Sequence, residues 1–281
     1  MGQPDNQIPR NLPEYGTAVT HGLVQTDSQE PAKLGPVGRL IGVLFSPGET
    51  FADINRKPTW LVPMILAMIV TIGSFLAFNW RVKPDWPKII RAQMIQRAED
   101  NNQPKPSEDQ LEQGVEVGMK ITKGIAYASA LFAPVTYLAL SGIFALSLIF
   151  VQANTTFKKI LSVVAWSGCG IWLVSIVVTT AVLMAKDAES LAEIDMSNPS
   201  AMTATNLSAF LPSDSSGALK ALASSLDVFS IWWIILLIIG LAAIGGSKKI
   251  TKSTTAKIVL ALWILFVLGK VGIRATGVFG R

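Results

Sequence analysis

The 281-residue sequence contains one cysteine and one histidine, and this scarcity excludes several kinds of chemistry. The lone Cys169 cannot form an intramolecular disulfide, and no Cys/His cluster has the spacing of metal ligands. The motifs HExxH, GxSxG and GxxxxGK[ST] are also missing from the chain. We therefore expect no enzyme activity, no catalytic residue, no metal site and no cofactor.

Charged side chains are also scarce. They make up 15% of the residues, whereas 50% of the residues are hydrophobic and the mean hydropathy is +0.44. This balance is far from that of a soluble domain and predicts an integral membrane protein. The net charge of +5 does not predict nucleic-acid binding, because in a membrane protein the position of Lys and Arg matters more than their total.

Five apolar runs approach or exceed the roughly 20 residues that a bilayer core requires. They predict an all-α fold with five transmembrane helices in a membrane domain at 60–275. None of the five contains Asp or Glu, which argues against an ion-coupled transporter and against intramembrane acid–base catalysis. The predicted spans are about 60–80, 124–151, 160–185, 228–246 and 257–275.

Two segments of different character precede the first span. Residues 1–35 are rich in polar residues and proline, which predicts a disordered cytoplasmic tail without a signal peptide. Residues 36–58 are predicted to be an amphipathic interfacial segment, the alternative being an ordinary lead-in to the first span. Its first helix places Leu40, Ile41 and Leu44 on one side and Arg39 on the other, as in a helix that lies on a membrane surface.

A second short helix is predicted at 47–57. Ser46 and Glu49 have the spacing of a capping box around Pro47, which suits the first helical position. Arg56 and Lys57 suit its carboxyl end, and Pro58 ends it.

Two polar inserts interrupt the membrane domain, at 81–123 and 186–227. The first is predicted to be a helical hairpin, because Ser107 and Gln110 form a second capping box before a helix that continues into the second span. This hairpin is either a solvated structural element or a binding surface. Pro134 should kink the second span. The 186–227 insert is predicted to be a loop with one or two short helices.

The distribution of basic residues sets the predicted topology. The connections at 152–159 and 247–257 contain six Lys and no acidic residue, which indicates that they are cytoplasmic. The inserts at 81–123 and 186–227 contain ten Lys or Arg and thirteen acids, and those ten conflict with the positive-inside rule. We still expect the N-terminus inside and the C-terminus outside, because the basic residues closely flank the short connections.

Two positive charges, Lys270 and Arg274, lie within the fifth span. A charge inside a span indicates function unless it can reach the membrane surface. Both residues are in the final turns, where they can extend to the surface or cover the last helix carbonyls.

Three features together resemble the bacterial branch of the Yip family, the Ypt/Rab-interacting membrane proteins. They are an FSPxETF-type segment before the first span, five spans, and a Thr-Phe-Lys-Lys segment that opens the third span. The resemblance covers about residues 38–275, although a proline common in the family's third span is replaced here by Gly168 and Gly170. The motif residues are Phe45, Ser46, Pro47, Glu49, Thr50, Phe51, Thr156, Phe157, Lys158 and Lys159.

The resemblance implies a non-enzymatic protein of the bacterial inner membrane. Eukaryotic members recruit small prenylated GTPases, and what carries over is an adaptor or membrane-organising role. The cytoplasmic interaction surface would consist of residues 36–57 and the basic loops at 158–159 and 248–257. Its partners would be the lipid bilayer and a cytoplasmic or membrane protein. The sequence leaves open whether the protein forms a homo-oligomer. The alternative is a channel or small-solute permease subunit with Lys270 and Arg274 as anion contacts.

Overall fold

Every regular element in the described part of the chain is a helix. The computed structural model describes Gly2 and residues 32–100, 103–185, 206–212, 215–246 and 250–275. The all-α prediction is confirmed. Most of the predicted tail at 1–35 lies outside the described residues, but Lys33 and Leu34 are included and contact the second helix.

Four helices are long and apolar enough to cross a bilayer: α3 (Leu61–Val82), α5 (Glu108–Phe150), α6 (Phe157–Ala185) and α10 (Lys252–Ala275). The predicted fourth span is α9 (Val228–Ile244), which has 17 residues. At about 1.5 Å per residue it rises about 26 Å, slightly less than a typical hydrocarbon core of about 30 Å. The chain is thus a multi-pass membrane protein with a short fifth apolar helix.

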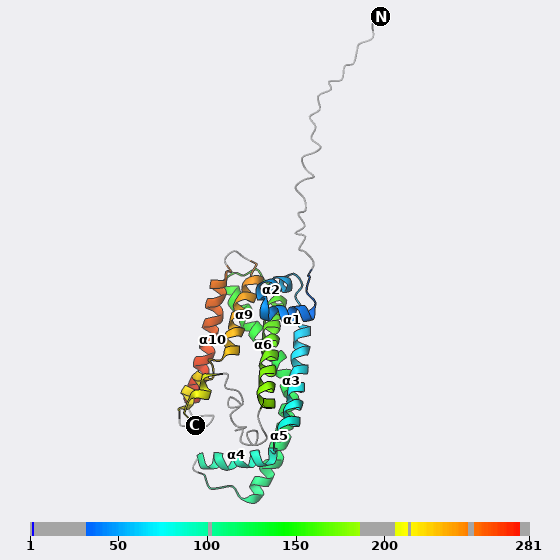
Figure 1. Ribbon diagram of the computed structural model, residues 1–281. Helices are drawn as coiled ribbons and strands as arrows, with labels where there is room; N and C mark the ends of the chain where they lie inside the picture. Colours follow the sequence, from blue (N-terminus) through cyan, green and yellow to red (C-terminus); the bar gives the residue numbers. More distant parts are fainter. Residues whose placement is uncertain are drawn as a thin grey trace. The chain divides into compact units, whose positions relative to one another are not determined.

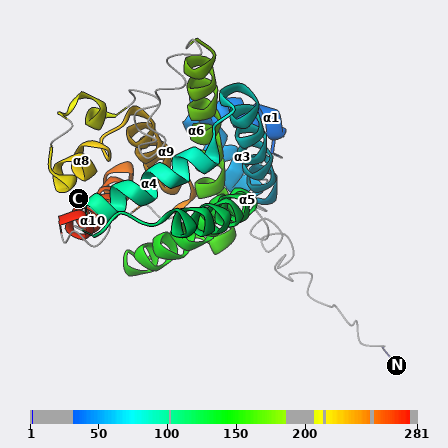
Figure 2. The same ribbon diagram turned by 90° about the horizontal axis from the view of Figure 1, so that it is seen from below.

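Helix α6 lies at the centre of this assembly. It contacts α3 and α5 on one side and α9 on the other, and α9 in turn contacts α10. Figure 2 shows α6 between α3 and α9. Its first half is almost continuously buried from Ile160 to Ile171, because Gly168 and Gly170 let neighbouring side chains approach its backbone closely.

Helices α1 (Pro36–Phe45) and α2 (Pro47–Arg56) pack against the end of the assembly where α6 begins. The predicted capping box at Ser46 and Glu49 is wrong, since Ser46 makes no side-chain cap bond. Ser46 ends α1 as well as starting α2, and its N–H donates to the carbonyl of Gly42 at 2.7 Å. Serving both helices gives Ser46 a backbone conformation (φ −139°, ψ 57°) unlike the extended one usual at an N-cap.

The first insert is the predicted hairpin. Helix α4 (Trp86–Asp100) runs antiparallel to the start of α5, where Ile90 faces Gly118 and Met94 faces Gly114. The capping box of Ser107 and Gln110 is confirmed, and α5 continues without a break through Pro134. Figure 1 shows α4 at the opposite end of the assembly from α1 and α2.

The second insert contains two short helices, as predicted for 186–227, within its described part. They are η2 (Leu207–Phe210) and α8 (Gly217–Ala223). Helix α8 packs against the last turns of α10, so this insert covers the end of the fifth span.

Candidate functional site: the α1–α2 hairpin

A buried ion pair joins the two short helices. Arg39 of α1 and Asp53 of α2 approach within 2.8 Å, and their side chains are only 3% and 4% exposed. The Arg39 Nε also donates to Asp53 Oδ2 at 3.0 Å, so the contact is bidentate toward one carboxylate oxygen. The sequence predicted Arg39 on the side of the helix opposite Ile41, which a helix on a membrane surface would turn toward water, but the structure buries that side. The guanidinium points inward because Asp53 offers it a buried partner.

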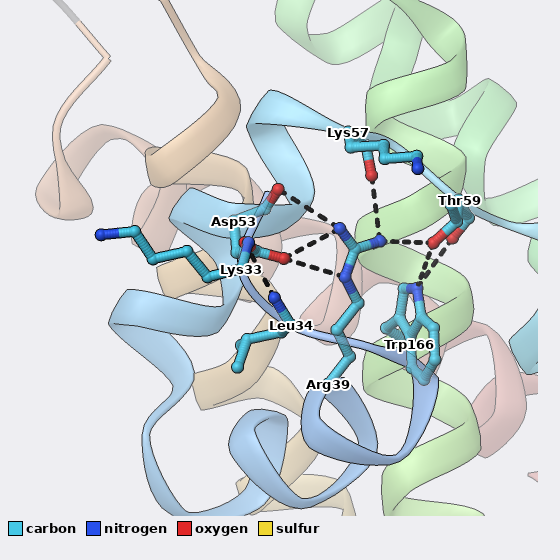
Figure 3. A network of polar contacts seen from close by, with 7 residues as sticks. All are labelled: Lys33, Leu34, Arg39, Asp53, Lys57, Thr59 and Trp166. Carbon is cyan, nitrogen blue, oxygen red and sulfur yellow. Dashed lines mark hydrogen bonds and ion pairs between the residues drawn. The ribbon is translucent and has the colours of Figure 1, made fainter. Parts of the chain in front are cut away.

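The same guanidinium reaches the chain that leads into the first span (Figure 3). Arg39 Nη1 donates to the carbonyl of Lys57 at 2.9 Å and to Thr59 Oγ1 at 2.5 Å. Trp166 of α6 donates its indole N–H to the carbonyl of Thr59 at 2.7 Å. One arginine thus connects α1, α2, the start of α3 and the central helix.

Asp53 is surrounded by donors on its other side. Its Oδ1 accepts the backbone N–H of Lys33 at 2.7 Å and that of Leu34 at 3.4 Å. Burial acts to raise the pKa of Asp53, but the Lys33 N–H and the Arg39 guanidinium outweigh it, and the pKa lies below its usual value. Asp53 is therefore a stable carboxylate whose lone pairs are occupied, which suits a structural fastening rather than acid–base catalysis.

Apolar contacts attach α2 of the hairpin to α6 and α9. Phe51 is completely buried, and its ring lies against Gly240 of α9, where an added Cβ would approach to 3.1 Å. The same Cβ would be 2.4 Å from Val163 of α6. Thr50, also fully buried, fills the space beside Gly42 of α1. Gly240 is thus the point where α2, α6 and α9 meet.

The residues of the Phe45–Phe51 motif are divided between the buried interior and the exposed surface. Thr50 and Phe51 belong to the packed interior, whereas Phe45, Ser46 and Glu49 are exposed and Pro47 is half-buried. The exposed surface continues along α1, where Val37, Ile41 and Phe45 repeat every four residues and are 70%, 55% and 76% exposed.

The second motif reaches the same end of the assembly. Thr156 precedes α6, and its carbonyl accepts the N–H groups of Lys159 and Ile160. Phe157 and Lys158 are exposed, and Lys159 is half-buried.

The last turn of α9 links the two motifs. The N–H of Asn154 donates to the carbonyl of Gly245, and Asn55 of α2 donates to the carbonyl of Ala243. The structure thus brings 45–57 and 156–159 to one end of the assembly, while their role as an interaction surface stays a prediction.

The charges of the fifth span lie elsewhere. Lys270 donates to the hydroxyls of Ser224 and Ser225 at 2.8 and 3.1 Å, just after α8. Arg274 is exposed one turn further. Neither residue approaches the motif residues, because α10 begins at the end of the assembly that carries them and runs away from it.

Sequence reasoning missed Asp53, Thr59 and Trp166 as partners. A signal existed, since α1 contains one cation among apolar residues and Arg39 lies four positions before Val43, the most deeply buried residue of that helix. In the part of the chain that the structure describes, no group of three or more His, Cys, Asp or Glu side chains could hold a metal ion.

Comparison with known proteins covers the same part of the sequence. The Yip1 domain matches residues 41–271, from the middle of α1 to the last turns of α10. The chain is 27% identical over 231 residues to the membrane protein YknW of Bacillus subtilis, which covers 82% of this chain and 88% of YknW. No solved structure gives a significant match. Because the Yip1 match extends over most of the sequence and includes both motif segments, the chain belongs to the Yip1 domain family of membrane proteins.

Proposed function

We propose that this protein is a non-enzymatic adaptor or membrane organiser of the bacterial inner membrane. The observation that carries the proposal is the firmly held α1–α2 hairpin, whose outer half leaves Ser46, Gly48 and Glu49 exposed. A hairpin fastened by the Arg39–Asp53 pair and by Phe51 presents these residues in one fixed geometry. A preordered surface loses less entropy when a protein partner binds.

Charge supports a cytoplasmic position for this end. The described residues in 32–60, 151–160 and 250–257 include eight Lys or Arg and two acids, and one of those acids, Asp53, is paired with Arg39. Short connections rich in Lys and Arg are retained on the cytoplasmic side. With α10 running away from this end, the C-terminal turn of α10 would lie outside.

The alternative of a channel or permease subunit gains no support from Lys270. Its ammonium group is bonded to two serine hydroxyls beside α8. That arrangement attaches the second insert to α10 and explains the position of the charge without a transported anion.

The adaptor role is tested by site-specific photocrosslinking in cells. A benzophenone amino acid at Glu49 should form a protein adduct, whereas the same group at Glu112, exposed on α5 at the other end, should not form it. Adding Arg39→Gln should abolish the adduct by releasing α1 from α2. Absence of an adduct at Glu49, or an equal adduct at both positions, would reject the adaptor role.

Orientation is tested separately with a membrane-impermeant thiol reagent. In a Cys169→Ser background, Lys158→Cys should react only when the reagent is inside, and Glu112→Cys only when it is outside. The reverse pattern would overturn the proposed topology.

A further inference from the structure

Helix α1 carries an apolar face that no described residue covers. Val37, Ile41 and Phe45 form a row along it and are more than half exposed. The opposite face contains Arg39 and Val43, which are buried against the assembly. The helix is therefore apolar on its outside and holds its charge inside, the reverse of a helix that faces water.

The depth of α1 along α6 indicates what covers this row. A Cβ added at Gly170 would lie 3.4 Å from Leu44 and 3.6 Å from Val43. Gly170 lies 13 residues after Phe157, the first residue of α6, and therefore about 20 Å along that helix. Figure 1 shows α1 lying across the assembly below the end at which α6 begins. A helix at this depth is beside the membrane-spanning part of α6.

The lipid-facing surface of the first span begins at the same depth. Thr59 is bonded to Trp166, four residues before Gly170 on α6. Helix α3 starts two residues after Thr59, and its first turns expose Leu61, Val62 and Ile65. The row on α1 is thus at the depth of the exposed apolar surface of the first span.

The buried ion pair fits the same position. An unpaired arginine in the hydrocarbon region is energetically costly, so such charges are normally paired inside the protein. Arg39 is paired with Asp53 and turned away from the row. Lys57, at the end of α2, is exposed and has the charge that attracts lipid phosphates.

We propose that α1 is seated within the lipid leaflet on the basic side of the protein, with phospholipid acyl chains covering Val37, Ile41 and Phe45. Helix α1 is then a half-membrane element, whereas Ser46, Gly48 and Glu49 of the hairpin remain exposed at the basic end. This placement does not depend on the adaptor role, since it concerns only what lies against the outer face of α1.

Collision accessibility of a spin label tests the placement in the full-length protein. Ile41→Cys, Ile264→Cys and Lys158→Cys are made in a Cys169→Ser background and reconstituted into phosphatidylglycerol and phosphatidylethanolamine vesicles. Ile264 is exposed on the α10 span and serves as the lipid control. Lys158, in the first turn of α6, serves as the water control. Apolar oxygen and a polar nickel complex are the two collision partners.

The label at position 41 should collide with oxygen as often as the label at 264 and should be shielded from the nickel complex. Nickel accessibility equal to that at 158 would place α1 in water and overturn the proposal. Shielding from both reagents would mean that protein covers the row, either a second copy or another part of the chain, and would also overturn it. All three positions are exposed, so the labels do not disturb the packed interior.

Discussion

The most apolar stretches of helices α6 and α10 have equal mean hydropathy but opposite environments. In the most apolar stretch of α6, 67% of the residues are buried, against 11% in α10. The buried half of α6 contains serine, alanine and glycine, which allow close contact, whereas α10 exposes large side chains such as Leu265 and Phe266. Lipid is as apolar as a protein core, so hydropathy marks both helices as spans, and side-chain size decides which one is central.

Breaking the Arg39–Asp53 pair, which is buried in the packed part of the protein, should have the largest effect on stability. Arg39→Gln leaves the buried Asp53 carboxylate without its cation and should lower the free energy of unfolding by about 3–5 kcal/mol. Cys169 is buried and is the only cysteine, so the temperature at which a thiol-reactive dye labels it reports the loss. Arg39→Met with Asp53→Leu should recover part of the stability. An unchanged labelling temperature in Arg39→Gln would show that the pair does not hold the hairpin.

Removing a phenyl ring should cost more stability beside α6 than on the lipid-facing surface of α10. Phe51→Ala empties a fully buried site between α6 and α9 and should cost about 3 kcal/mol or more. Phe266→Ala on α10, where the ring is 67% exposed, should change stability by about 0.5 kcal/mol or less. The same dye-labelling measurement applies to both variants. Equal losses would contradict the assignment of Phe51 to the interior.

Adding a methyl group gives a matched and smaller contrast. In Gly240→Ala the new Cβ would lie 2.4 Å from Val163, and the strain should cost about 1–3 kcal/mol. Gly269→Ala on α10 meets nothing within 4 Å and should be neutral or stabilising by up to about 1 kcal/mol. A Gly240→Ala protein as stable as the wild type would mean that α2, α6 and α9 are not in close contact there.

Lowering the pH should destabilise the α1–α2 hairpin. Near neutral pH this is the smallest of the expected effects. Because the pKa of Asp53 is lowered in the folded protein, its contribution is fully present above the ordinary carboxyl pKa of about 3.9 and is lost as the pH falls through the folded value. Asp53→Asn should remove this part of the pH dependence. The measurement is the midpoint of thermal unfolding of both proteins, followed by circular dichroism, between neutral pH and pH 3. Parallel curves would contradict the role of Asp53.

Much of the architecture follows from local sequence patterns. Long apolar runs predict the spans, and Ser107 with Gln110 predicts the start of α5, because both signals depend only on nearby residues. The family resemblance also came from short segments, Phe45 to Phe51 and Thr156 to Lys159, and the Yip1 match confirms it.

The candidate site was predicted less completely. Its segments were identified, but Ser46 and Glu49 do not form the predicted capping box, since Ser46 joins two helices. Helical periodicity placed Arg39 opposite Ile41, on the side that a helix on a membrane surface would turn toward water. Periodicity cannot include a partner 14 residues away in the next helix, and that partner reverses the orientation.

The sequence by itself determined an all-helical membrane protein with a basic end, because apolar length and charge position act along the chain. Only the tertiary structure decided that α6 is central, that Phe51 is interior and that Arg39 turns toward Asp53. Each of these depends on residues far apart in the chain, such as Gly240 beside Phe51 and Trp166 beside Thr59. A bilayer orders the spans by hydropathy, but the contacts among them depend on shape and on the pairing of buried charge.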